Sequence, residues 1–148
     1  MNILTVNLLF STFVFYIAAR LYLLPILLLH ALRHLGLMFL APGAVYAGIP
    51  QPFTVPAAFG DLLAAVLALI AIPAVASRAK IAKPLVWLFN IVGSLDLLNA
   101  IVLATIYDAA PLMGPAYWIP AFWVPALLVT HYVTFLLLLR PWPRTASM

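Results

Sequence analysis

Three residues that can carry or exchange charge, His30, Arg33 and His34, interrupt an apolar run between residues 26 and 40. Because an α-helix turns about 100° per residue, positions i, i+3 and i+4 share one face, and these three side chains are expected to form one polar stripe. An arginine in hydrocarbon costs about 2.5 kcal/mol or more, so it is normally paired or functional. Histidine exchanges protons near neutral pH, and the stripe therefore favours proton transfer or the binding of a polar solute.

Four further polar residues fall inside apolar segments: Asp61, Asn90, Asp96 and His131. At 1.5 Å per residue, Asn90 and His131 share a layer with Arg33 and His34, roughly 10–13 Å from the cytoplasmic face. Asp96 lies higher and is the first choice as the acidic partner of Arg33. Asp61 is the second choice, because it is expected in the first turn of its helix, where the helix dipole favours a carboxylate.

These seven residues together form the predicted ligand-binding site, and Arg33, His34 and His131 are expected to converge on one cavity in it. Other polar residues in the spans have a structural interpretation. Ser94 and Asn99, like Asn90, are expected to hydrogen-bond neighbouring helices, and Thr130 to hydrogen-bond its own backbone.

The composition places these residues in a membrane. Of the 148 residues, 68% are hydrophobic and 7% are charged, whereas a soluble domain has about 25% charged residues. The length suits a single transmembrane domain over residues 1–148. The sequence contains no cysteine, which excludes disulfides, thiolate metal sites and iron–sulfur clusters. The net charge of +4 comes from basic residues beside apolar spans, so it indicates orientation in a lipid bilayer and no nucleic-acid partner.

Hydropathy predicts an all-α, polytopic transmembrane bundle with five spans, at residues 3–20, 26–41, 57–77, 83–107 and 117–139. The first apolar block, residues 3–41, would be about 58 Å long as one helix, and the hydrocarbon core is about 30 Å thick. Arg20 and Pro25 mark the expected break. The alternative has four spans, with a kinked or interfacial helix at residues 28–40. In the last span, Pro125 is expected to kink the helix.

With five spans, all the basic segments lie on one side of the membrane. The N-terminus is then outside and the C-terminus cytoplasmic, as expected for a multi-pass protein of a cell inner membrane. Four stretches resemble a family of small, uncharacterised bacterial multi-spanning membrane proteins: HALRHLGLMFL (30–40), PAAFGDL (56–62), WLFNIVGSLDLL (87–98) and VPALLVTH (124–131). The resemblance covers nearly the whole chain, implies a bacterial inner-membrane location and brings no activity.

The preferred hypothesis is binding or transport of a small solute or protons, with no cofactor and no metal. One alternative is a b-type haem held by His34 and His131, with Arg33 near a propionate. Another is a scaffold, assembly or lipid-binding subunit with a membrane-protein partner or as a homo-oligomer. An enzyme is disfavoured, because the sequence has no phosphate-binding glycine loop, HExxH motif or nucleophile elbow, and no glutamate.

Overall fold

The computed structural model describes residues 23–140, and every element within that range is helical. The elements follow one another in this order: α2 (Leu23–Ala31), the 3-10 helix η1 (Leu32–Leu40), α3 (Gln51–Ala76), α4 (Ala82–Ile106), the short 3-10 turns η2 (Ala110–Leu112) and η3 (Gly114–Tyr117), the π-helical turn η4 (Ile119–Trp123) and α5 (Val124–Leu139).

Four stretches in this range are long and apolar enough to cross a membrane: residues 23–40, 51–76, 82–106 and 114–139. They correspond to the last four predicted spans. The predicted first span, residues 3–20, lies outside the described residues, so the structure supports four spans and not the fifth. The alternative of an interfacial helix at 28–40 does not describe this segment, because η1 packs along α3 inside the bundle.

The first described span changes its helical type halfway. Eighteen α-helical residues would reach about 27 Å, but the 3-10 half rises about 2 Å per residue and lengthens the segment to about 31 Å. The change also resets the buried face. In a 3-10 helix residues i and i+3 eclipse, and the buried residues from α2 into η1 follow that spacing: His30, Arg33, Gly36 and Phe39.

The two long helices end in the same way. The residue after each C-cap, Arg78 or Asp108, has a left-handed backbone, with φ of 52° and 45°. The amide of the next residue then reaches back five residues, from Ala79 to Ala74 and from Ala109 to Ala104. This is the Schellman arrangement, which satisfies the last carbonyls of a helix and turns the chain sharply.

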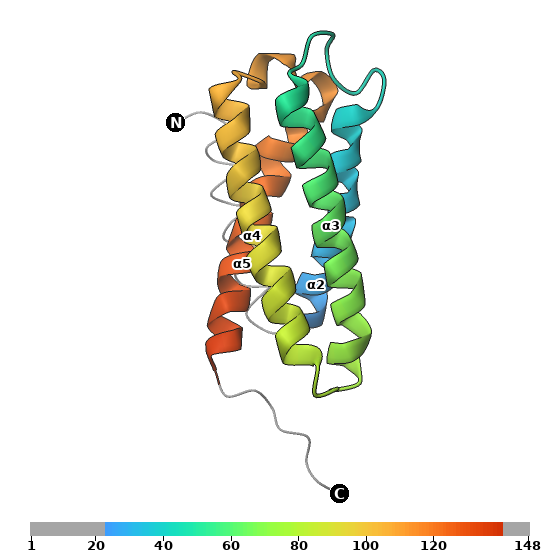
Figure 1. Ribbon diagram of the computed structural model, residues 1–148, viewed down its shortest axis with the longest axis vertical. Helices are drawn as coiled ribbons and strands as arrows, with labels where there is room; N and C mark the ends of the chain where they lie inside the picture. The colour runs from blue at the N-terminus through green and yellow to red at the C-terminus, as the bar shows by residue number, and fades with distance from the viewer. Residues whose placement is uncertain (1–22, 141–148) are drawn as a thin grey trace, which may run out of the picture.

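Helix α3 is the central element of packing, because α4 lies along one side of it and α2 with η1 along another, while α5 packs on α4 and α2 (Figure 1). Its buried face carries small side chains: Ala57, Ala58, Ala64, Ala65, Ala68, Ala71 and Ala74. Alanine allows the backbones of neighbouring helices to approach closely, which is the main source of helix association in lipid. Large apolar side chains such as Leu95 and Phe59 are exposed on the outside, as expected for a lipid-facing surface.

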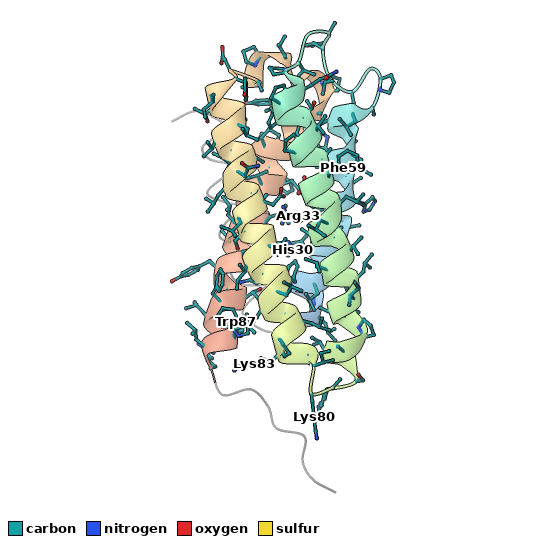
Figure 2. The ribbon with its side chains drawn as sticks, viewed as in Figure 1. His30, Arg33, Phe59, Lys80, Lys83 and Trp87 are labelled. Carbon is teal, nitrogen blue, oxygen red and sulfur yellow. The ribbon has the colours of Figure 1, made fainter. Side chains whose placement is uncertain are left out.

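The bundle has a basic end and a loop end. Among the described residues, the basic side chains other than Arg33 are at the basic end, where α3 and α5 finish and α4 begins: Arg78, Lys80, Lys83 and Arg140 (Figure 2). The loop end carries the connections 41–50 and 107–118, whose one charged residue is Asp108. This asymmetry is typical of a membrane protein with a defined orientation.

Two apolar clusters separate the ends from the middle of the bundle. The loop-end cluster consists of Phe39, Phe53, Ala57, Ala109, Met113, Ala116 and Ile119. The basic-end cluster consists of Leu27, Ala68, Ala71, Val86, Phe89 and Leu138. The buried charged residues lie between them, in the middle of the spans, so the core of the protein is polar at the depth where a bilayer is least polar.

Candidate functional site

Arg33 is the centre of the polar layer and is completely buried. Its Nε donates to Asp61 Oδ1 over 2.7 Å, and its Nη2 donates to Asp96 Oδ2 over 2.6 Å. Its Nη1 contacts the Gly93 carbonyl and His131 Nε2, both at 3.1 Å. A guanidinium has five donors in a rigid plane, so this one side chain links η1 to α3, α4 and α5. In Figure 2 the Arg33 label lies near mid-height between α3 and α4.

Both acidic residues considered from the sequence are partners of Arg33. The Asp61 and Asp96 side chains are 12% and 10% exposed, and each is bound through one oxygen. Two carboxylates and one guanidinium sum to a formal charge of −1 when all three are ionised. An uncompensated charge in an apolar interior is costly, so this centre is electrostatically incomplete without one more positive charge.

The histidine of α5 is held in one tautomer by its neighbours. Because arginine can only donate, His131 Nε2 must accept from Arg33, and the ring proton therefore lies on Nδ1. That proton is donated to Asn90 Oδ1 over 2.7 Å. The Asn90 amide in turn donates to the His131 backbone carbonyl over 3.2 Å. His131 is thus neutral and fully hydrogen-bonded in this arrangement.

The histidine of α2 has one nitrogen without a partner. Thr130 donates its hydroxyl to its own helix, at Ala126 or Leu127, so it accepts from His30 Nε2 over 2.8 Å. His30 Nδ1 then carries a bare lone pair, and it is buried with no hydrogen-bond partner among residues 23–140. The ring lies against His131, with centroids 4.2 Å apart. A buried acceptor without a donor is uncommon in folded proteins.

Three glycines make room for this centre. A Cβ on Gly36 would overlap the Asp61 carboxylate, and one on Gly60 would overlap the Asp96 carboxylate. A Cβ on Gly93 would lie 2.6 Å from the His131 ring and 2.8 Å from Arg33 Nη1. Each of the three helices that meet at the charges therefore has no side chain at its point of closest approach. From the sequence, Gly60 could be noticed because it directly precedes Asp61. That glycines lie against the two carboxylates is visible only in the structure.

The expectation that His34 converges with Arg33 and His131 is wrong. His34 is exposed, and its Nδ1 donates to the Ala31 carbonyl of its own turn over 3.0 Å. The physical reason is the change to 3-10 geometry after Ala31. The i+4 position, which shares a face in an α-helix, is rotated by about 120° away from i+3 in a 3-10 helix.

The residues do not fit a haem between two histidines. His34 faces outward, away from His131, and both ring nitrogens of His131 already have partners. The other histidine pair is also unsuitable, because the His30 and His131 rings are in direct contact and leave no slot for an iron between them.

Two other placements differ from expectation. Asp61 was expected in the first turn of its helix, but α3 begins six residues earlier than predicted, at Gln51, and continues through Pro56. Asp61 therefore lies about 15 Å inside the helix, where the helix dipole does not explain it. Of the helix-bridging residues predicted in α4, Asn90 reaches α5, Ser94 bonds its own helix at Asn90, and Asn99 is exposed.

The fold and the site define a class of helical bundle in which four segments are long and apolar enough to cross a membrane and share a buried ionic centre. The chain belongs to the family described as a domain of unknown function, DUF8737, whose model matches residues 3–139. This extent agrees with the resemblance over nearly the whole chain that the sequence indicated. No curated protein and no solved structure matches the chain.

Proposed function

We propose that this protein binds a proton at the Arg33–Asp61–Asp96 centre and uses it in the transport of protons or a small solute across a bacterial inner membrane. One observation carries the proposal: a single buried guanidinium contacts two buried carboxylates, at 2.7 and 2.6 Å. Intramembrane ionisable groups of this kind are typical of proton and solute pathways.

The charge balance of the Arg33–Asp61–Asp96 triad supports a bound proton. Neutral His131 accepts from Arg33 and contributes no charge, so the triad is neutral only when one carboxyl group is protonated. The oxygens that Arg33 does not bind, Asp61 Oδ2 and Asp96 Oδ1, are the places for that proton. They lie against Gly36 and Gly60, where an added Cβ would overlap them.

Access to the centre along the length of the bundle would require movement of the apolar clusters. The loop-end cluster is flanked by the two irregular segments of the spans, the 3-10 helix η1 and the π-helical turn η4. If η1 rewound to an α-helix, Phe39 would rotate by about 120° relative to Arg33, since the two geometries differ by about 20° per residue over six residues. Phe39 now packs on Phe53, with ring centroids 5.2 Å apart, and such a rotation would open that end.

Infrared spectroscopy in lipid bilayers tests the bound proton. A protonated carboxyl group has a carbonyl stretch that a carboxylate lacks. We expect this signal in the unmodified protein, and we expect it to persist as the pH is lowered, because a carboxyl group that is already protonated keeps its proton under more acidic conditions. Asp61→Asn or Asp96→Asn should remove it, since one carboxylate then balances Arg33. Asp108→Asn is the matched control, because asparagine also adopts the left-handed backbone at that exposed turn. An unchanged signal in both core variants would refute the bound proton.

Proton flux into liposomes tests transport. The protein is reconstituted with a trapped pH-sensitive dye and a clamped membrane potential. Flux above that of empty liposomes, reduced by Asp61→Asn and Asp96→Asn and retained in Asp108→Asn, supports transport. A bound proton without flux would refute proton transport.

A structural role is the second candidate, because most donors of Arg33 have partners and the centre ties four spans together. A scaffold, assembly or lipid-binding subunit would be less stable in the Asp61→Asn and Asp96→Asn variants, and the unmodified protein would show no proton flux.

The orientation and the number of spans form part of the proposal. The basic end should face the cytoplasm, because positively charged loops are retained there. The apolar stretch 3–20 has the composition of a further span, which would place the N-terminus outside and the C-terminus in the cytoplasm. Reporter fusions at both termini test this arrangement, and finding both on one side would refute it.

A further inference from the structure

Two of the polar side chains that point outward from the spans carry groups that lipid cannot satisfy. His34 in η1 and Asn99 in α4 are both exposed, although most of the exposed surface of these spans is leucine, isoleucine and valine. Neither His34 Nε2 nor the Asn99 amide has a hydrogen-bond partner in the part of the chain that the structure describes. A polar group in hydrocarbon without a partner is costly, so each is expected to find one.

The two groups are complementary. Because a carbonyl only accepts, the bond to Ala31 requires that His34 Nδ1 donates, which leaves Nε2 as a bare acceptor. Asn99 carries two amide protons, and its side chain can therefore donate to that nitrogen. Two copies of His34 could not pair with each other in this tautomer, because both would accept.

The two groups also lie at the same depth. His34 is six residues before the end of η1, or about 12 Å from the loop end at 3-10 rise. Asn99 is seven residues before the end of α4, or about 10 Å. The contact between Arg33 and Asp96 links the two helices at nearly that height. Matching depth is necessary for contact between copies that share one bilayer plane.

We propose that this protein self-associates in the membrane head to tail, with Asn99 of one copy donating to His34 Nε2 of the next. The two residues are on different helices, η1 and α4, which pack on α3 from separate sides. One copy can therefore offer both halves of the contact to two neighbours, which is a heterologous interface; such interfaces give rings when the rotation between copies closes and open chains when it does not. The proposal is independent of the bound proton.

Cross-linking tests the pairing directly, because the chain has no cysteine of its own. Two differently tagged chains are co-expressed in membranes, one with His34→Cys and the other with Asn99→Cys, and treated with a short thiol cross-linker. We expect a product that contains both tags. The matched control is Phe59→Cys in α3, which is 56% exposed and about 12 Å from the same end. Products between two His34→Cys chains, or a mixed product no stronger than that of the control, would overturn the proposal.

Association between copies tests its energetic basis. Labelled protein is diluted with lipid in liposomes, and energy transfer between copies is followed. His34→Leu or Asn99→Leu should weaken association by about three- to twentyfold, the range for one interhelical hydrogen bond in a membrane. The double variant should lose no more than either single variant, because both remove the same bond. Phe59→Leu should change nothing. Unchanged association in the single variants, or additive losses, would overturn the pairing even if the copies still associate.

Discussion

Replacing Arg33 by leucine should destabilise the bundle more than any other single substitution of a polar residue in it. The substitution leaves Asp61 and Asp96 without their counter-ion in an apolar interior. It also removes the donors to the Gly93 carbonyl and to His131. The partners of Arg33 come from three different helices, so the substitution weakens the packing of the whole described bundle.

The structure sets the magnitude. The two carboxylate side chains are 12% and 10% exposed, so water screens them little. Breaking a buried ion pair by removing one partner costs about 3–5 kcal/mol, which lowers the folding equilibrium constant by about a hundredfold to a few thousandfold. Asp96→Asn keeps the shape of the side chain and leaves one carboxylate for Arg33. It should therefore lower the free energy of unfolding by only about 1–1.5 kcal/mol, the contribution of one hydrogen bond.

Unfolding by sodium dodecyl sulfate in mixed micelles, followed by tryptophan fluorescence, measures these differences. Arg140→Leu, at the exposed end of α5, is the control and should change little. The triple variant with Arg33→Leu, Asp61→Asn and Asp96→Asn should be more stable than Arg33→Leu alone, because it buries no unpaired charge. If Arg33→Leu costs no more than Asp96→Asn, or if the triple variant recovers nothing, the argument from buried charge is refuted.

Three further predictions follow from the same geometry. Gly60→Ala should reduce stability because its Cβ overlaps the Asp96 carboxylate, and it should cost less when Asp96→Ala is also present; additive losses in the same titration would contradict this overlap. Asn90→Leu should cost about 1–3 kcal/mol, because it leaves a buried histidine proton without an acceptor, whereas the exposed Asn99→Leu should leave the unfolding of the monomer unchanged. A cleavage site inserted in the loop 77–81 should be cut from the cytoplasmic side of membrane vesicles, and cutting from the opposite side would reverse the proposed orientation.

The sequence by itself determined the membrane environment, four of the spans and the need for a partner of Arg33. These properties depend on local composition: the length of an apolar run relative to the bilayer, and the cost of a charge within it. The bounds of α4 were within one residue of expectation. The start of α3 was not, because the span was predicted to begin at residue 57, directly after Pro56, whereas the helix includes this proline, which a helix in a bundle can tolerate.

The tertiary structure decided which polar residues meet. Depth could be estimated from sequence, but rotation of each helix about its axis could not, because it depends on packing against neighbours. The change to 3-10 geometry after Ala31 buried Gly36 where His34 was expected, whereas His30 and Arg33 share a face in either geometry. Glycines on three helices then allowed the charges to approach. No local pattern shows these contacts, since each joins residues from helices far apart in the sequence.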